Sequence, residues 1–286
     1  MVGDMLRRSA DAVSAVSDVP AMPAIRISNL NFAIGTRGNA EGLCILDDIN
    51  LEVGEGEFVA LVGTSGCGKS TLLNMISGMY HPSSGEVSVF GTPVTGIPKR
   101  VGYMFQTDSL LPWRRVIRNV EMGLELAGVA AGERRERAMR QLAELGLGGF
   151  ENHWPSELSG GMRQRAALAR TWLTNPDILL MDEPFGALDS QTRLMIQESF
   201  LAVWEKRKQS VVLVTHDIEE AIAMADRVIV MSARPGRIKS VYQIELKRPR
   251  SLIALRSDDK FHTYWQSIWA DLEEGARRSF ATDTTA

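Results

Sequence analysis

The stretch LVGTSGCGKSTLLNM, from Leu61 to Met75, decides the fold of this chain. It opens with apolar residues typical of a buried strand, passes through three glycines, and resumes an apolar pattern typical of a helix. Glycines let successive backbone N–H groups turn inward without Cβ clashes, and the N-terminus of the following helix adds partial positive charge. We therefore predict a phosphate-binding loop made of Gly63, Thr64, Ser65, Gly66, Cys67, Gly68, Lys69, Ser70 and Thr71.

Three side chains of this loop carry specific chemistry. Lys69 supplies a full positive charge for the terminal phosphates of a nucleotide, and the hydroxyl of Ser70 can bind Mg²⁺. Cys67 lies in the same electropositive setting, so we expect a lowered thiol pKa. Thiol alkylation should then inhibit the protein, and bound nucleotide should protect it.

Two acids end a second apolar strand, DILLMDEP. Asp182 is placed to hold Mg²⁺ through water, and Glu183 to polarise a water molecule that attacks the γ-phosphate. A cap or a salt bridge at a strand end is the plainer interpretation of such a pair. Together with the phosphate-binding loop, the acids predict nucleotide hydrolysis.

The composition limits the classes of protein that fit. The chain has 286 residues, 44% of them hydrophobic, and a net charge of −3, which is ordinary for a soluble globular protein and gives no global basic field for nucleic acid. No apolar run reaches the roughly 18 to 20 residues needed to span a bilayer. Two cysteines, Cys44 and Cys67, are too few for a disulfide framework and favour a reducing, cytoplasmic compartment.

The order of the apolar segments indicates an α/β fold. Short strands such as AIRISNL, ILDDINLEV and GEVSVFG predict an antiparallel β portion, and long amphipathic patterns predict a helical region over about 108–174. From residue 177 onward, buried strands alternate with helices, which predicts a mostly parallel, doubly wound sheet. The expected domains are a disordered leader over 1–23, the main domain over 24–250, and a C-terminal amphipathic helix with its tail over 251–286.

The segment LSGGMRQRAALAR, residues 158–170, resembles the signature of ATP-binding cassette (ABC) ATPases, usually written LSGGQ. Met162 takes the last position of that motif, after Ser159, Gly160 and Gly161. A serine and two glycines that open a helix form a second anion-binding end. The resemblance covers nearly the whole chain beyond the leader. It implies a P-loop NTPase cassette with a mostly parallel, doubly wound core sheet, an antiparallel β subdomain and an α-helical subdomain.

Three more positions match motifs of the same family, in the order that the family requires. Gln106 in YMFQTDSLLPW matches the glutamine loop, Asp189 in GALD the D-loop, and His216 in VTHD the switch histidine. The resemblance implies that Gln106 senses Mg²⁺ and the attacking water, and that His216 holds the γ-phosphate. Taken singly, the three have plainer interpretations as a loop amide, a helix N-cap and a strand-end hydrogen-bonding group.

The family also implies a dimer. Two cassettes meet head to tail, so that ATP with Mg²⁺ on one phosphate-binding loop is closed by the signature residues of the other. The second cassette can be another copy or a related subunit. Family members stack an aromatic ring on adenine, but the matching position here is Ile34; Phe32, on the same face of the strand, is the aromatic candidate.

Several phrases, among them DSLLPWRRVIRNV, DEPFGALDSQTR and VMSARPGRI, resemble the group that serves nitrate, sulfonate, taurine and bicarbonate uptake. This implies the ATP-hydrolysing subunit of a bacterial importer, peripheral on the cytoplasmic face of the inner membrane, with separate transmembrane permease subunits and an external solute-binding protein. The permease contact would be the apolar loop of Leu110, Leu111, Pro112 and Trp113. Packing of Trp113 inside the helical subdomain is the other interpretation.

Two other functions stay open at this point. A soluble, non-transport ABC ATPase could act on nucleic acid or ribosomes, although such relatives generally carry two cassettes or a long coiled-coil insertion, and no basic patch is present. A regulatory module could bind ATP without turnover, which the presence of Glu183 disfavours. The aromatic residues of the C-terminal helix fit either core packing or a subunit contact.

Overall fold

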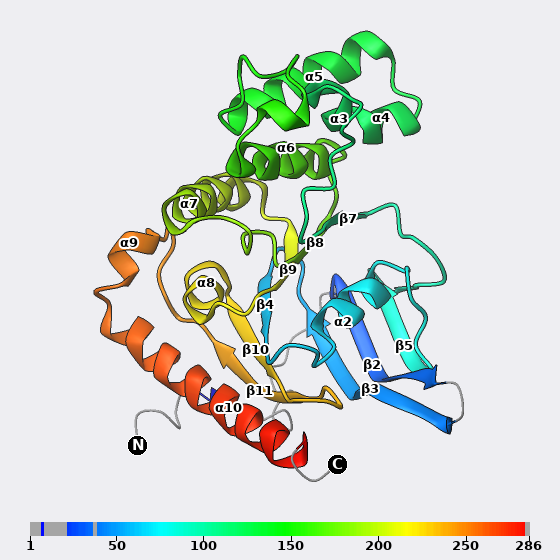
Figure 1. Cartoon of the computed structure of the whole chain (residues 1–286), viewed down its shortest axis with the longest axis vertical. Coiled ribbons are helices and arrows are strands. Elements are labelled where there is room, and N and C mark those ends of the chain that lie inside the picture. Colours follow the sequence, from blue (N-terminus) through cyan, green and yellow to red (C-terminus); the bar gives the residue numbers. More distant parts are fainter. Residues whose placement is uncertain (1–6, 9–21, 37–38, 284–286) are drawn as a thin grey trace. The chain divides into compact units, whose positions relative to one another are not determined.

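The structure, a computed structural model, describes residues 7–8, 22–36 and 39–283. The chain divides into two compact units (Figure 1). Unit 1 comprises Met1–Pro98 and Lys208–Ala286, and unit 2 comprises Lys99–Arg207.

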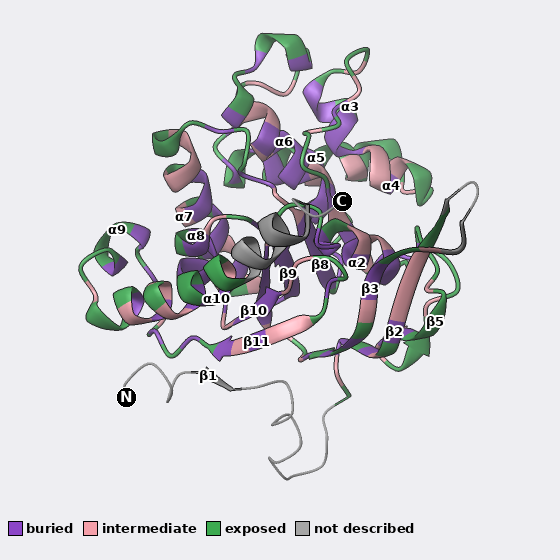
Figure 2. Cartoon of the chain, turned by 60° about the horizontal axis from the view of Figure 1, so that its bottom comes forward, coloured by how far each residue is buried: buried purple, intermediate pink, exposed green. Residues whose placement is uncertain are grey.

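A sheet with parallel inner strands forms the centre of unit 1. Strand β4 (Phe58–Val62) pairs in parallel with β9 (Ser210–Val214) on one side and with β10 (Arg227–Met231) on the other. Strand β11 (Ile238–Gln243) pairs antiparallel with β10. Every residue of β4 and β9 is buried, as their continuous apolar runs predict for strands covered on both faces, and Figure 2 shows β9 and β10 in purple.

An antiparallel sheet completes the β structure of unit 1. Its strand order is β3, β2, β5, β6, where the strands are β2 (Ile25–Thr36), β3 (Asn39–Val53), β5 (Ser84–Val89) and β6 (Thr92–Pro93). The β2–β3 hairpin is longer than the segments AIRISNL and ILDDINLEV predicted, with register irregularities along its length. This sheet matches the antiparallel β portion expected from the sequence.

Helices cover the parallel strands of unit 1. Helix α2 (Lys69–Ile76) contacts β5 and β9, and α8 (Ile218–Met224) contacts β4 and β10. After the short α9 (Leu252–Leu255), the long α10 (Asp259–Asp283) contacts α8, β10 and β11 (Figure 1). Most of the expected leader lies outside the described residues, but Arg7–Arg8 form β1, which pairs antiparallel with β11.

The aromatic residues of α10 divide between core and surface. Phe261, Tyr264 and Ile268 are buried, so core packing accounts for them. Trp265 and Trp269 stack on each other with ring centroids 5.4 Å apart, and Trp269 remains half exposed.

Unit 2 combines one parallel strand pair with a set of helices. Strand β7 (Val101–Met104) pairs in parallel with β8 (Ile178–Asp182). The helices are α3 (Val116–Val120), α4 (Met122–Leu126), α5 (Ala131–Glu144), α6 (Gly160–Leu173) and α7 (Ser190–Arg207), with a 3₁₀ turn over Pro155–Glu157. Helix α6 contacts the other four helices and β7, and its Trp172 stacks on Phe200 at 5.0 Å. The region expected to be helical therefore consists of several helices packed around α6.

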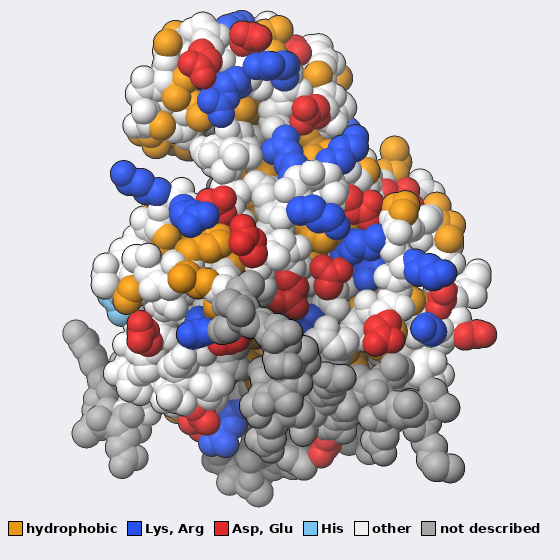
Figure 3. All heavy atoms as spheres, turned by 180° about the vertical axis from the view of Figure 1, so that it is seen from behind, with side chains coloured by type: hydrophobic (Ala, Val, Ile, Leu, Met, Phe, Trp, Pro, Cys, Tyr) orange, Lys and Arg blue, Asp and Glu red, His pale blue; other side chains and the backbone are white. Residues whose placement is uncertain are grey.

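Positive and negative side chains are interspersed on the face shown in Figure 3. Among the helices that the structure describes, none combines the length and the apolar character needed to cross a bilayer.

Candidate nucleotide-binding site

The predicted phosphate-binding loop connects β4 to α2 in unit 1. Its last residue before the helix, Gly68, is the N-cap of α2 and has a φ of 101°, in the left-handed region. A Cβ on Gly68 would also lie 2.6 Å from the side chain of Leu46. Both constraints select glycine, and the resulting turn leads directly into the N-terminal end of α2, where free N–H groups favour an anion.

Lys69 lies folded back over this loop. Its side chain is buried, and Nζ donates hydrogen bonds to the carbonyl oxygens of Gly63 at 2.8 Å and Thr64 at 3.0 Å. Ser70 follows on the exposed side of the first turn of α2. The arrangement places an ammonium group and a hydroxyl at the same helix end, which is the donor set that a nucleotide phosphate and its metal ion require.

Cys67 differs from the prediction. It is buried, with Sγ 3.8 Å from Nζ of Lys69, and burial raises the pKa of its thiol. The positive charge of Lys69 acts in the opposite direction but is the smaller effect. The expected lowering of the Cys67 pKa is therefore wrong, because loss of solvation outweighs the electropositive setting.

The candidate residues for the adenine base lie on β2. Phe32 stacks on Tyr80, with ring centroids 6.1 Å apart and an interplanar angle of 19°. Ile34 is 49% exposed and pairs in register with Leu43, which is 43% exposed. The ring of Phe32 is thus already in contact with another ring of unit 1, whereas the Ile34–Leu43 pair presents an exposed aliphatic surface. Nothing in the sequence marked Tyr80, because it follows α2 outside every motif.

In unit 2, the structure brings two predicted catalytic residues together. Nε2 of Gln106, just after β7, donates to Oε2 of Glu183 at 3.3 Å. Asp182 ends β8, and its Oδ2 accepts a hydrogen bond from Tyr103 at 3.4 Å. Glu183 has a φ of 45°, a strained conformation for a glutamate and one that clusters at functional sites. Sequence reasoning missed Tyr103, whose place on the strand before Gln106 was the available signal.

The signature segment forms the start of α6. Ser159 is the N-cap, and its hydroxyl accepts a hydrogen bond from the backbone N–H of Met162 at 3.3 Å. Gly160 is exposed, whereas Gly161 is buried, and a Cβ there would collide with the side chain of Thr192 at the start of α7. The serine and Gly160 are thus accessible at a helix N-terminus that can receive an anion.

Helix α6 also holds the segments that follow Gln106 and Glu183. Arg163 forms an ion pair with Asp108 at 3.0 Å, and Arg170 donates to the carbonyl oxygens of Ser109 and Asp108 at 2.7 and 2.9 Å. Gln164, buried on the same helix, donates to the carbonyl oxygen of Pro184. These contacts tie the signature helix to both catalytic loops of unit 2, and no sequence motif indicated them.

A buried asparagine fixes the loop expected to contact a permease. Asn119 accepts from the backbone N–H of Leu111 at 2.7 Å and donates to the carbonyl oxygen of Arg114 at 2.8 Å. Trp113 is 71% exposed, so it does not pack inside the helical region. The structure places Pro112 on the surface and Leu111 partly so, whereas Leu110 is buried and supports the loop from within.

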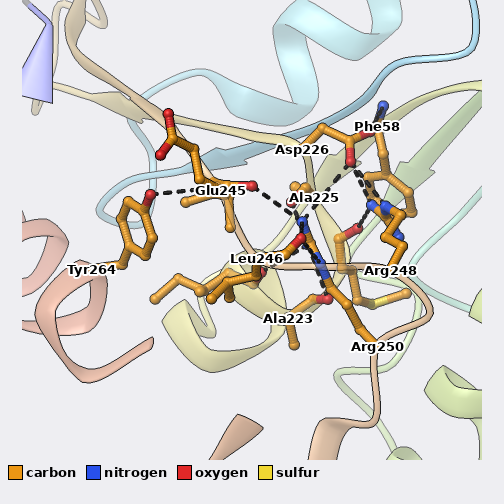
Figure 4. Close-up of polar contacts among 12 residues, drawn as sticks. Phe58, Ala223, Ala225, Asp226, Glu245, Leu246, Arg248, Arg250 and Tyr264 are labelled. Atoms are coloured by element: carbon orange, nitrogen blue, oxygen red, sulfur yellow. Dashed lines mark hydrogen bonds and ion pairs between the residues drawn. The ribbon is translucent and has the colours of Figure 1, made fainter. Parts of the chain in front are cut away.

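His216 is exposed between β9 and α8 in unit 1. Helix α8 is capped at its N-terminus by Asp217, which accepts from the N–H of Glu220. At the other end, the buried guanidinium of Arg250 donates to five carbonyl oxygens (Figure 4), those of Ile222, Ala223, Ala225, Ile244 and Leu246. Backbone groups at both ends of α8 thus have hydrogen-bond partners, which stabilises the helix that directly follows His216 and Asp217.

Asp189 caps α7 in unit 2. Its Oδ1 accepts a hydrogen bond from the N–H of Thr192 at 3.0 Å, and hydrogen bonds from Thr192 lower the pKa of this exposed carboxyl group. The predicted D-loop residue therefore has the N-cap role that was its plainer interpretation; a role in a dimer stays a prediction.

Three residues, Ser70, Gln106 and Asp182, are the predicted protein ligands of Mg²⁺. Over residues 22–35 and 42–274, no group of three or more His, Cys, Asp or Glu side chains is placed to hold a metal ion. Mg²⁺ commonly takes only one or two protein ligands and completes its shell with phosphate oxygens and water. The hydroxyl of Ser70 in unit 1, and the amide oxygen of Gln106 and the carboxylate of Asp182 in unit 2, are each oxygen donors of the kind that Mg²⁺ prefers.

Three comparisons relate the chain to known proteins. The family model described as "ABC transporter" matches residues 46–186. An uncharacterized ABC transporter ATP-binding protein of Methanocaldococcus jannaschii is 45% identical over 255 residues, which cover 89% of this chain and 93% of the relative. The taurine import ATP-binding protein TauB of Rhizobium johnstonii is 49% identical over 203 residues, 71% of this chain and 78% of the relative. A solved ATP-binding cassette, dimeric in a post-hydrolysis state with ADP and Pi, matches with a TM-score of 0.69 and 33% identity over 78% of this chain and 100% of that chain.

Proposed function

Because the chain belongs to the ATP-binding proteins of the ABC transporter family, we propose that it powers an importer for a small anion. Nitrate, a sulfonate, taurine and bicarbonate are the candidates. In this proposal the chain is peripheral on the cytoplasmic face of a bacterial inner membrane. Transmembrane permease subunits and a second cassette bind it directly, and an external solute-binding protein delivers the anion.

Family membership confirms two expectations from the sequence. The fold is that of an ABC cassette, with a mostly parallel sheet, an antiparallel β subdomain and helices. The activity is ATP hydrolysis, in a family with a solved member that is a dimer with ADP and Pi bound. ATP is therefore the nucleotide, and the individual residue roles and the transported solute belong to the proposal.

In unit 1, we assign the phosphates of ATP to residues 63–71. Backbone N–H groups of the loop and the N-terminal end of α2 would surround the phosphates, and Lys69 would neutralise their charge. His216, at the end of β9, would donate to the γ-phosphate. The base would lie on the aliphatic pair Ile34–Leu43 rather than on Phe32, since that ring is already stacked on Tyr80.

In unit 2, Glu183 is the proposed general base. Its carboxylate would orient and deprotonate the attacking water, while Gln106, hydrogen-bonded to the same carboxylate, would hold that water in place. Ser159, Gly160, Gly161 and Met162 would close over the nucleotide of the partner cassette, with α6 contributing the positive end of its dipole. Mg²⁺, when bound by Ser70, Asp182 and Gln106, supplies charge neutralisation at the phosphate oxygens.

The observation that carries the importer proposal is the loop of Leu111, Pro112 and Trp113. It begins shortly after Gln106 in the sequence, and Gln106 donates a hydrogen bond to Glu183, so a partner bound at Trp113 would be connected to the catalytic carboxylate. A large exposed tryptophan on a loop held rigid by Asn119 is typical of a contact surface. The similarity to a taurine import protein supports an importer and does not fix its solute.

Co-purification with the membrane-spanning protein encoded beside this chain tests the proposal. The Leu111→Ala/Trp113→Ala variant should lose the membrane protein and keep ATP hydrolysis in solution. Leu126→Ala is the matched control, because Leu126 is 82% exposed in the same unit and lies outside the loop. If no membrane protein is retained by the wild type, while the chain alone hydrolyses ATP at full rate, the importer function must be given up and a soluble ABC ATPase becomes the better description.

A further inference from the structure

The turn between β10 and β11 packs against the phosphate-binding loop within unit 1. This turn, residues 232–237, lies within the segment VMSARPGRI. Gly236 is buried, and a Cβ at this position would collide with the carbonyl oxygen of Cys67. The backbone of the turn therefore approaches the backbone of the phosphate-binding loop as closely as glycine allows.

Arg234 adds a polar contact one residue earlier in the loop. Its Nε and one terminal nitrogen donate to the carbonyl oxygen of Gly66 at 3.3 and 3.2 Å. In a loop whose N–H groups turn inward to receive an anion, the carbonyl oxygens point outward and need donors. The guanidinium of Arg234 satisfies one of them with a charged group, which binds more strongly than a neutral donor.

The chemistry of a peptide unit links this contact to the nucleotide. The carbonyl of Gly66 and the N–H of Cys67 belong to the same peptide group. The N–H of Cys67 donates to the carbonyl oxygen of Thr64 at 3.3 Å and so closes a turn of the phosphate-binding loop. A positive charge on the carbonyl oxygen of Gly66 polarises the shared peptide group and strengthens this hydrogen bond, as hydrogen bonds in series reinforce each other. It also fixes the plane of the peptide, and so the direction in which the N–H points.

The turn is itself held firmly. The N–H of Gly236 donates to the carbonyl oxygen of Ile45 at 2.8 Å, and the N–H of Asp47 donates back to Gly236 at 3.0 Å. Arg237 forms an ion pair with Asp47, and the hydroxyl of Ser232 accepts from the N–H of Arg237 at 2.9 Å. Strand β3 thus holds the turn in place, and the turn contacts the phosphate-binding loop.

We infer that Arg234 is a positioning residue for nucleotide binding: through the carbonyl of Gly66 it orients the phosphate-binding loop and strengthens its hold on the phosphates of ATP and ADP. This inference rests on the proposed function, because it requires that residues 63–71 bind the phosphates. Arg234 acts through the loop backbone and does not take part in the chemical step. Its loss should therefore raise KM and leave kcat nearly unchanged.

The test measures binding of ATP and ADP to the full chain by calorimetry, and KM and kcat for ATP hydrolysis. Arg234→Ala should weaken binding of both nucleotides by about fivefold to tenfold. This is less than a buried charged donor would contribute, because Arg234 is exposed to solvent. The kcat should stay within about twofold of wild type. Arg234→Lys should recover part of the affinity, because an ammonium can donate one bond. Arg256→Ala is the matched control: it also removes an exposed arginine from unit 1, and its ion pair is with Glu219.

The Lys69→Ala variant distinguishes failure of the Arg234 inference from failure of the proposed phosphate site. If Lys69→Ala loses ATP binding while Arg234→Ala binds as well as wild type, the role of Arg234 is wrong and the proposed site stands. If Arg234→Ala and Arg256→Ala weaken binding equally, the effect is general electrostatics and the inference is overturned. If neither Lys69→Ala nor Arg234→Ala changes affinity, the phosphate site itself is misplaced, and the inference falls with it. Thermal unfolding of each variant shows whether a loss of affinity reflects loss of fold.

Discussion

The thiol of Cys67 lies inside the phosphate-binding loop with a pKa raised by burial. At pH 8 it therefore carries less thiolate than an ordinary cysteine, and its reaction with iodoacetamide should be slow. Cys44 is exposed on β3 and provides an internal control in the same protein. Mass spectrometry of alkylated peptides should show Cys44 modified first, with Cys67 labelled only as the pH rises or the protein unfolds. Labelling of both residues at equal rates in the native protein would contradict this expectation.

The sequence predicted candidate residues for the site but not the contacts that surround them. Glycine spacing fixes the backbone path of residues 63–71, so the loop could be recognised from the pattern alone. The degree of burial of Cys67 depends on contacts with distant segments, among them the turn that contains Gly236, and no local pattern reports it. Tyr80 was missed for the same reason, because its contact with Phe32 is not marked by its neighbours in sequence. Tyr103 could have been suspected from its place on the strand before Gln106, but its hydrogen bond to Asp182 could not.

Helix α7 begins at a charged cap. Asp189 accepts a hydrogen bond from the N–H of Thr192, and this contact lowers its pKa. Since the folded state favours the ionised form, the stabilisation is present above the ordinary aspartate pKa of about 3.9 and is lost as the pH falls through the lowered value. Asp189→Ala should therefore lower Tm at pH 7, and the difference from wild type should shrink below a pH of about 4. Asp189→Asn, which keeps the cap, should lose less; a Tm difference that does not depend on pH would refute the electrostatic part.

Helix α10 is attached to β11 by a buried carboxylate. Oδ2 of Asp271 accepts hydrogen bonds from the hydroxyls of Tyr242, at 2.6 Å, and Ser240, while Nζ of Lys239 donates to its backbone carbonyl at 2.6 Å. Asp271→Ala removes the carboxylate that accepts from the Ser240 hydroxyl and from the Tyr242 hydroxyl, although the Tyr242 hydroxyl also donates to the carbonyl oxygen of Ser267 at 3.2 Å. The change should lower the free energy of unfolding by about 1–3 kcal/mol, measured in urea. Gln266→Ala, on the exposed side of α10, should change it by less than about 0.5 kcal/mol. Equal effects would show that Asp271 has no special role in attaching the helix.

Sequence periodicity predicts where helices and strands lie better than it predicts which residues contact each other. The apolar runs of β4 and β9 and the helix over Ser190–Arg207 follow from local pattern, and the family resemblance supplied the cassette. The sequence also showed that α10 is amphipathic. That its apolar face includes a buried acid, and that Trp269 stays half exposed, depend on the surface it meets, which only the fold provides.

In the proposed function, two cassettes and a membrane partner act together. ATP held on the loop of one cassette would be closed by Ser159 and Gly160 of the second, so that nucleotide stabilises the dimer and hydrolysis releases it. Catalysis and assembly are thus separable: a change that blocks hydrolysis and spares binding should hold the dimer closed. Glu183 is the residue at which this separation is expected, because its proposed role is with water and not with the nucleotide.

The catalytic role of Glu183 is tested most directly by measuring ATP turnover. The wild-type chain and the Glu183→Gln variant are compared, each assembled with the membrane protein. Glu136→Gln, the same chemical change at an exposed position of α5, is the control. The account predicts that Glu183→Gln binds ATP as tightly as wild type, runs as a stable dimer in its presence, and loses at least about a hundredfold in turnover. Turnover retained by Glu183→Gln would remove the catalytic role from this carboxylate, and an absence of turnover by the wild-type assembly would contradict the claim that hydrolysis by this chain drives transport.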